Sequence, residues 1–172
     1  MSKGMIQVYT GNGKGKTTAA LGGVLRALGN NMKVCIIQFM KGKETGEIKM
    51  LKGMDNVDIN QFGTGEFLKK GDPSYEDYKA AEMALEFFKD TMNSRQYDLI
   101  ILDEIVTAVN YGLIELWELV DAVTTKPQPL ELILTGRDAP PEILKAADLV
   151  TEMLEIKHYY NNGIEAREGR EY

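Results

Sequence analysis

The feature that most constrains the fold is a glycine-rich turn between a short apolar run and a helical pattern. Residues 5–9 have the pattern of a strand, and residues 19–28 that of a helix. Between them stands Thr10-Gly11-Asn12-Gly13-Lys14-Gly15-Lys16-Thr17-Thr18. Such a turn directs backbone N–H groups and the positive end of the helix dipole at one point. Lys16 adds a mobile cation and Thr17 a hydroxyl suited to Mg²⁺, so the turn predicts a triphosphate site.

The glycine spacing departs from the common phosphate-binding loop, or P-loop. That pattern has a glycine five residues before the Gly of Gly-Lys-Thr. Here the position holds Thr10, and Gly11 comes one residue later, so the loop is one residue tighter. The alternative is a Gly-rich turn with an incidental Lys-Thr pair. The strand pattern before the turn and the helix pattern after it favour the P-loop.

Apolar runs alternate with helical patterns along the rest of the chain. We expect further strands at residues 34–39, 57–62, 99–102, 132–134 and 149–156, and helices at 75–92, 116–123 and 141–147. This alternation predicts one α/β domain over residues 1–172, with a mostly parallel central sheet flanked by helices. With the P-loop, the fold class is P-loop NTPase-like, or RecA-like, and ligands bind at the carboxyl ends of the strands. Residues 41–54 and 63–74 are expected to be long loops.

Composition narrows the class of protein. The net charge of the 172 residues is −6, which argues against a broad surface for nucleic acid or membrane. There is no apolar run long enough to span a bilayer and no signal peptide. Cys35 is the only cysteine, so no internal disulfide can form, and we expect it to be a buried, inert thiol. These features predict a cytoplasmic protein. Trp117 is expected to lie in the core.

Polar residues follow two of the expected strands. Asp103 and Glu104 come directly after the strand at 99–102, where a carboxylate is the usual second anchor for Mg²⁺ and a triphosphate. The alternative is a pair of acids that cap the next helix. Arg137 follows another strand and can contact phosphate, or be an ordinary surface arginine. Arg26 lies about three helical turns beyond the P-loop, where most arginines are simply solvated.

The remaining candidates carry weaker signals. Phe67 lies in a glycine-bordered loop and either caps a flat ligand or packs as a loop anchor; sequence alone favours the anchor. His158 is the only histidine, and a lone histidine is usually structural. No side chain stands out as a general base, which a kinase or hydrolase normally needs. That absence is expected if the nucleophile is already strongly nucleophilic.

Several short motifs occur together in a fixed order. They are the loop at 10–22, Gln38-Phe39-Met40-Lys41-Gly42, Leu102-Asp103-Glu104, Leu134-Thr135-Gly136-Arg137, Ala147 to Glu152, Lys157-His158 and the terminal segment 163–172. This ordered set, which covers nearly the whole chain, resembles the ATP:corrinoid adenosyltransferases of the P-loop type. The shortened P-loop is the most distinctive match.

The resemblance implies a reaction without phosphoryl transfer. A corrinoid (cobalamin or cobinamide) reduced to Co(I) attacks C5′ of ATP, and inorganic triphosphate leaves in one piece. By matching position, the residues implied to bind triphosphate are Asn12, Gly13, Lys14, Gly15, Lys16, Thr17 and Thr18. Thr17 and Glu104 would hold Mg²⁺, and Lys16 would act with them in catalysis. Arg137 would contact phosphate, Arg26 the nucleoside end of ATP, and Phe67 the corrinoid.

The resemblance also implies partners: a second copy of the chain in a homodimer, and an electron-donor reductase, expected to be a flavoprotein. Two departures accompany it. Longer members carry an N-terminal cover for the site, whereas only residues 1–4 precede the first strand here. Better-known members have Gly-Phe-Thr-Trp in the corrinoid loop, where this chain has Gly65-Glu66-Phe67-Leu68-Lys69. The rival hypotheses are a P-loop kinase or ATPase, and a non-catalytic nucleotide-dependent corrinoid-binding module.

Overall fold

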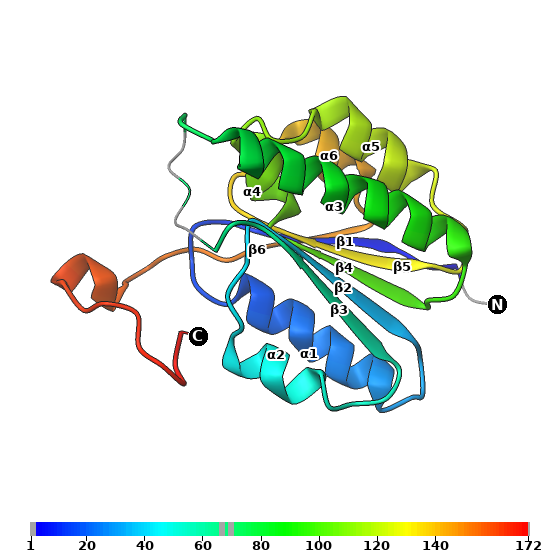
Figure 1. Cartoon of the computed structure of the whole chain (residues 1–172), viewed down its shortest axis with the longest axis horizontal. Helices are drawn as coiled ribbons and strands as arrows, with labels where there is room; N and C mark the ends of the chain where they lie inside the picture. The colour runs from blue at the N-terminus through cyan, green and yellow to red at the C-terminus, as the bar shows by residue number, and fades with distance from the viewer. Residues whose placement is uncertain (1–2, 66–67, 69–70, 172) are drawn as a thin grey trace.

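The computed structural model describes residues 3–65, 68 and 71–171, and its centre is a sheet of six parallel strands (Figure 1). The strands are β1 (Ile6–Thr10), β2 (Val34–Phe39), β3 (Val57–Phe62), β4 (Leu99–Asp103), β5 (Glu131–Thr135) and β6 (Leu149–Glu152). They lie in the order β3-β2-β4-β5-β1-β6, and each neighbouring pair is parallel. The predicted α/β class with a parallel central sheet is confirmed.

Helices cover both faces of the sheet. They are α1 (Lys16–Leu28), α2 (Gly46–Leu51), α3 (Tyr75–Ser94), α4 (Ile105–Asn110), α5 (Leu116–Thr124) and α6 (Pro141–Ala146), with a short 3₁₀ helix, η1 (Tyr159–Asn162), near the C-terminus. Figure 1 shows α1 and α2 on one face and the other four α-helices on the opposite face. Within the described ranges, no helix is both long and apolar enough to cross a lipid bilayer.

The two faces have separate cores. In β4, Ile100 and Leu102 pack in the core on the α3 side, and Leu99 and Ile101 pack with α1 on the other. Successive side chains of a strand point to opposite faces. A strand covered on both faces therefore needs apolar residues at every position, which explains the continuous apolar run at 99–102.

The strand order decides which loops meet. The carboxyl ends of β2, β4, β5 and β1 are neighbours at one edge of the sheet. The segments that follow these strands begin at Met40, Glu104, Gly136 and Gly11. Residues that are distant in sequence, and that the motifs above single out, are therefore collected along one edge.

The structure corrects three sequence expectations about elements. The expected loop at 41–54 contains α2, in which Ile48 and Leu51 are buried one helical turn apart. The β-branched run after Glu104 forms the unpredicted helix α4. The last strand, predicted over 149–156, ends at Glu152. Its neighbour β1 stops at Thr10, and beyond that point the chain bonds to the P-loop instead of to a strand.

Trp117 is exposed rather than buried in the core, with 68% of its surface accessible. The helix that carries it, α5, buries Leu119, Ala122 and Val123. Trp117 precedes Leu119 by two residues, which is about 200° around a helix, so it lies on the opposite side. The expectation that a tryptophan belongs to the core was wrong because the helix face, not the residue type, decides burial here.

Candidate functional site

The predicted P-loop lies at the carboxyl edge of the sheet, between β1 and α1. Gly11 and Gly15 have backbone φ angles of 97° and 118°, in the region that favours glycine. Gly15 is the N-cap of α1, so Lys16 begins the helix. The first turn of a helix leaves backbone N–H groups without partners inside the helix, and these groups attract anions. The context on which the triphosphate hypothesis depends is therefore present.

Lys16 curls back over the loop. Its ammonium donates to the carbonyl oxygens of Gly11, at 2.6 Å, and Gly13, at 2.8 Å. Burial lowers the pKa of Lys16, and the nearby carboxylate of Glu104 acts in the opposite direction. An ammonium has three N–H donors, and these carbonyls take two of them. The charge is thus held beside the loop, within reach of an anion bound there.

The chain beyond β6 forms a second wall behind the P-loop. Gly13 N–H donates to the Met153 carbonyl at 2.7 Å, and Met153 N–H donates to the Thr10 carbonyl at 2.9 Å. A Cβ on Gly11 would lie only 2.4 Å from the Met153 carbonyl oxygen, and one on Gly13 only 2.7 Å. These glycines are therefore required by the close approach of the C-terminal segment. Sequence reasoning missed Met153, because no local pattern joins it to the loop.

Asp103 is the buried centre of the polar network at this edge. Its Oδ1 accepts from the hydroxyls of Thr17, at 2.8 Å, and Thr135, at 2.7 Å. Its Oδ2 accepts from Gln38 Nε2 at 2.9 Å and from Lys41 Nζ at 2.6 Å. Burial alone would raise the pKa of Asp103, but the Lys41 charge and these hydrogen bonds outweigh it and lower that pKa. Asp103, rather than Glu104, is thus the carboxylate in contact with Thr17.

Glu104 occupies the N-cap of α4, with a left-handed φ of 63°, but makes no side-chain capping bond. Its Oε2 instead accepts from the Thr107 hydroxyl at 2.6 Å. The sequence left open whether Glu104 is a metal ligand or a helix cap. A helix cap would accept a hydrogen bond from a backbone N–H of α4, and the side chain of Glu104 makes no such bond. Glu104 is therefore a carboxylate oriented by Thr107. It lies at the edge where the carboxyl ends of the strands meet, which is called the phosphate edge below because the P-loop is part of it. Sequence reasoning did not identify the role of Thr107.

Arg137 is exposed just after β5, at the same edge. Its backbone N–H donates to the Thr107 hydroxyl at 3.1 Å, so Thr107 links the segments that carry Arg137 and Glu104. Gly136 precedes it with a φ of 149°, and a Cβ there would lie 2.6 Å from the Thr107 backbone nitrogen. Besides burial, the charge of Arg137 lowers the pKa of Lys16, whereas that of Glu104 raises it.

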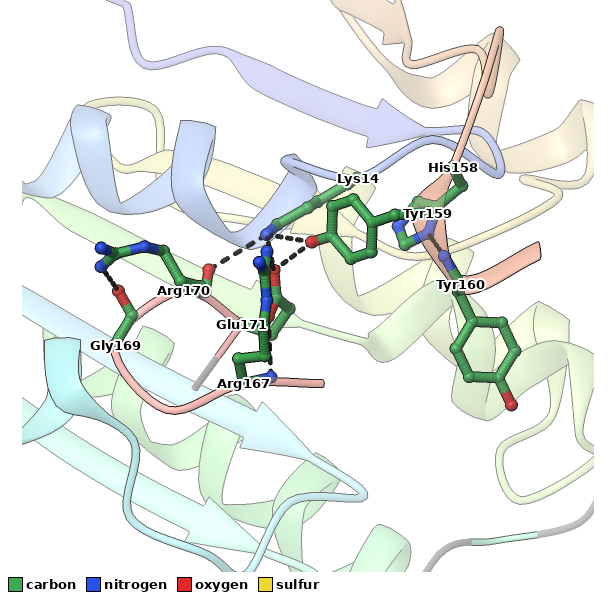
Figure 2. Close-up of polar contacts among 8 residues, drawn as sticks. All are labelled: Lys14, His158, Tyr159, Tyr160, Arg167, Gly169, Arg170 and Glu171. Carbon is green, nitrogen blue, oxygen red and sulfur yellow. Dashed lines mark hydrogen bonds and ion pairs between the residues drawn. The ribbon is translucent and has the colours of Figure 1, made fainter. Parts of the chain in front are cut away.

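Lys14 points away from this network, toward the C-terminal segment (Figure 2). Its ammonium donates to the Tyr159 hydroxyl at 3.0 Å, the Arg170 carbonyl at 3.0 Å and Glu171 Oε1 at 2.9 Å. Glu171 also accepts from the Tyr159 hydroxyl and from Arg167. All three donors of Lys14 are therefore used by the end of the chain. The predicted contact of its side chain with triphosphate would require at least one of these bonds to break.

The other predicted residues are less closely joined to the loop. Asn12 and Thr18 are exposed beside it. Arg26 is exposed ten residues beyond Lys16, roughly 15 Å along α1 at 1.5 Å per residue. It lines a cavity of about 630 Å³ whose wall includes Tyr9, Gly22, Thr151 and Met153, so the cavity reaches the segment that backs the P-loop. Phe67 lies outside the described residues.

Comparison with known proteins identifies the family of this chain. The family described as ATP:corrinoid adenosyltransferase BtuR/CobO/CobP matches residues 2–172. The chain belongs to this family. Among its relatives, the corrinoid adenosyltransferase of Pseudomonas aeruginosa is 36% identical over 172 residues, which are 99% of this chain and 84% of that protein. The Escherichia coli K12 corrinoid adenosyltransferase is 35% identical over 170 residues, 99% of this chain and 86% of the relative. One from Sinorhizobium is 38% identical over 174 residues, covering 99% and 81%.

Membership confirms the family that the ordered motifs predict, and the protein is a corrinoid adenosyltransferase by family. The individual site residues remain predictions.

Proposed function

We propose that this adenosyltransferase moves the 5′-deoxyadenosyl group of ATP to the Co(I) centre of a corrinoid, in the biosynthesis or salvage of adenosylcobalamin. An electron pair of Co(I) forms the cobalt–carbon bond to C5′, and cobalt becomes formally Co(III). The C5′–oxygen bond breaks, and its electron pair leaves with inorganic triphosphate. The observation that carries this proposal is the shortened P-loop with Lys16 curled over it, in a chain that matches the family from residue 2 to residue 172.

In this proposal the P-loop holds the leaving group. Negative charge grows on the triphosphate as the C5′–oxygen bond breaks, and fixed positive groups stabilise that charge. Positive groups at this edge include Lys16, the N–H groups of the first turn of α1 and the exposed Arg137. The first two are in place before the reaction, so they need little reorganisation. Asn12, Gly13, Gly15 and Thr18 complete the proposed triphosphate contacts, and Lys14 joins them once it leaves Glu171.

Thr17 and Glu104 fit a magnesium ion bound to the triphosphate. Their oxygen atoms are hard ligands, and Mg²⁺ on a nucleotide is commonly held by one or two protein groups besides phosphate and water. The described residues contain no group of three or more His, Cys, Asp or Glu side chains placed to hold a metal. A site in which phosphate oxygens supply some of the ligands does not need three such side chains. When bound, the ion would neutralise charge on the triphosphate.

Among the described residues of this edge, the buried Asp103 is not available as a general base, which favours this chemistry over phosphoryl transfer. Both carboxylate oxygens of Asp103 accept two hydrogen bonds each, and Glu104 accepts one from Thr107. A kinase needs a group to orient and deprotonate a hydroxyl, whereas Co(I) carries no proton to remove. The network is thus better suited to holding an anion than to activating a nucleophile.

The nucleoside and the corrinoid are assigned to neighbouring surfaces. We assign the nucleoside end of ATP to Arg26, because the cavity that Arg26 lines extends to Met153 behind the P-loop. Phe67 is proposed to contact the corrinoid, on the family resemblance alone.

Two partners and a location complete the proposal. Burial raises the pKa of the Cys35 thiol to about 12, and this cysteine is the only one in the chain. The protein therefore has no thiol pair to make Co(I), and we assign that step to a separate electron-donor reductase, a flavoprotein, in the cytoplasm. The edge strand β6 exposes Leu149 and Val150, and exposed apolar edges favour pairing with another chain. We therefore propose a homodimer.

Product analysis tests the reaction. The protein is incubated with ATP, Mg²⁺ and chemically reduced cobalamin, and phosphorus NMR follows the nucleotide. We expect inorganic triphosphate in equal amount to adenosylated corrinoid. Formation of ADP without a cobalt–carbon bond would establish a kinase or ATPase instead. Tight ATP binding without any turnover would establish a non-catalytic binding module.

A further inference from the structure

Lys41 is a charged residue of the phosphate edge that the proposed mechanism does not yet use. It follows β2, and the left-handed backbone of Met40, with a φ of 58°, turns the chain just before it. Its Nζ lies 2.6 Å from Asp103 Oδ2 and 3.5 Å from the hydroxyl oxygen of Thr17. The side chain of Lys41 is 27% exposed, whereas that of Asp103 is 1% exposed. The ammonium therefore lies where the buried network meets the surface.

Asp103 is fully occupied as a hydrogen-bond acceptor. A carboxylate offers about four lone-pair directions, and four donors fill them here: Gln38, Thr17, Thr135 and Lys41. It has no capacity left for a further ligand unless one of these bonds breaks. Its effect is to fix the positions of the Thr17 hydroxyl and the Lys41 ammonium relative to each other.

Lys41, by contrast, is not fully occupied by the contacts described. One donor serves Asp103, and the Thr17 oxygen at 3.5 Å is at the limit of a hydrogen bond. The 2.6 Å contact with the Asp103 carboxylate holds the ammonium beside a buried negative charge. A charged ammonium with donors to spare, next to the first turn of α1, is placed to bind an anion.

We propose that Lys41 is a catalytic residue that contacts the leaving triphosphate, and that Asp103 is the positioning residue that holds it there. The inference rests on the proposed function and deepens it. Lys16 and Lys41 would then approach the triphosphate from different sides, from the P-loop and from the end of β2. Two preorganised cations suit a leaving group on which several negative charges accumulate.

The alternative role for Lys41 is that of a counter-ion for the buried Asp103. A double substitution distinguishes this role from contact with triphosphate. Calorimetry measures the binding of inorganic triphosphate, without metal, to Lys41→Met, Asp103→Asn and the double variant. Lys49→Met, on the exposed side of α2, controls for the loss of one positive charge. Thermal unfolding of every variant checks the fold. The double variant leaves no unpaired buried charge, so it remains informative if Lys41→Met alone is unstable.

We expect Lys41→Met to weaken triphosphate binding about tenfold or more, as for loss of a charge-assisted hydrogen bond. The double variant should still bind more weakly than Asp103→Asn, by a smaller factor, because Asp103→Asn has already lost the contact that positions Lys41. Equal binding by the double variant and Asp103→Asn would overturn the inference, because Lys41 would then only neutralise Asp103. Unchanged binding by Lys41→Met would overturn it as well. Failure of the unmodified protein to bind triphosphate would instead count against the proposed function.

Discussion

Three charged side chains at the phosphate edge have polar partners that fix where their charges lie. The Lys16 ammonium rests on two loop carbonyls, the Asp103 carboxylate on hydroxyl and amide donors, and the Glu104 carboxylate on Thr107. Groups held in this way need little rearrangement when an anion binds. Substitution of Lys16 or Glu104 should therefore change binding or rate with little effect on the rest of the fold.

Lys16→Ala should abolish turnover while the protein stays folded. One preorganised charge beside the triphosphate contributes ~3 kcal/mol or more to the transition state, a rate loss of about 100-fold or greater. The loss of rate is measured from initial rates with pre-reduced cobalamin, and circular dichroism checks the fold. Lys33→Ala, at an exposed position before β2, is the matched control. Near-normal activity in a folded Lys16→Ala protein would remove the basis for the P-loop assignment.

Glu104→Gln should weaken the dependence on Mg²⁺ more than the binding of ATP. The amide keeps the size of the side chain and can still accept from Thr107, but it loses the charge that attracts a hard cation. A Mg²⁺ titration at fixed ATP should show a half-saturation point raised severalfold. Glu142→Gln, on the surface of α6, serves as the control. If neither the half-saturation point nor the rate changes, Glu104 is not a metal ligand.

Arg26→Ala should raise the KM for ATP severalfold without changing inhibition by inorganic triphosphate. Arg26 is at the far end of α1 from Lys16, so it can contact the nucleoside only if ATP extends along the cavity that Arg26 lines. Steady-state kinetics with inorganic triphosphate as inhibitor separates the two ends of the nucleotide, and Lys145→Ala is the control. An equal rise in the KM for ATP and in the inhibition constant of triphosphate would place Arg26 near the phosphates. If neither constant changes, Arg26 is a solvated surface residue.

Among the elements, the C-terminal segment gives the P-loop a partner that its own sequence does not reveal. Residues 153–154 pack behind the loop, and Lys14 donates to Tyr159, Arg170 and Glu171 (Figure 2). The strands at 34–39 and 99–102 could be predicted because burial on both faces demands uninterrupted apolar runs. The helices α2 and α4 could not, since each has only six residues, too few for a period to be visible, and neither starts with a proline as the equally short α6 does.

Glu171→Gln should loosen the C-terminal segment. The hydrogen bond from Lys14 is the largest of the effects that lower the pKa of Glu171, so the carboxylate stays charged unless the pH falls below the usual glutamate range. At pH 8 the ion pair between Lys14 and Glu171 is therefore intact, and the neutral amide of Glu171→Gln should weaken this contact. Trypsin cleavage after Arg167, followed by mass spectrometry, should become severalfold faster than in the exposed control Glu165→Gln. Equal cleavage rates would mean that the contacts of Glu171 do not hold the segment.

At the scale of the whole molecule, the order of the strands creates the site. The sequence predicts that Lys41, Asp103, Arg137 and the P-loop each follow a strand, but it does not predict that β2, β4, β5 and β1 are neighbours. Strand order depends on how the crossing helices pack, which no local pattern records. For the same reason, the choice between Asp103 and Glu104 as the partner of Thr17 required the structure. The single domain over residues 1–172 stays a prediction.

The central claim is that C5′ of ATP, and no phosphorus atom, is the centre that reacts. The most direct measurement uses ATP labelled with carbon-13 at C5′, incubated with the protein, Mg²⁺ and Co(I) cobalamin, and carbon NMR of the corrinoid isolated in the dark. The account predicts that the label appears in a carbon bonded to cobalt, with one equivalent of intact triphosphate released. A corrinoid without the label, beside ADP that retains it, would contradict the account.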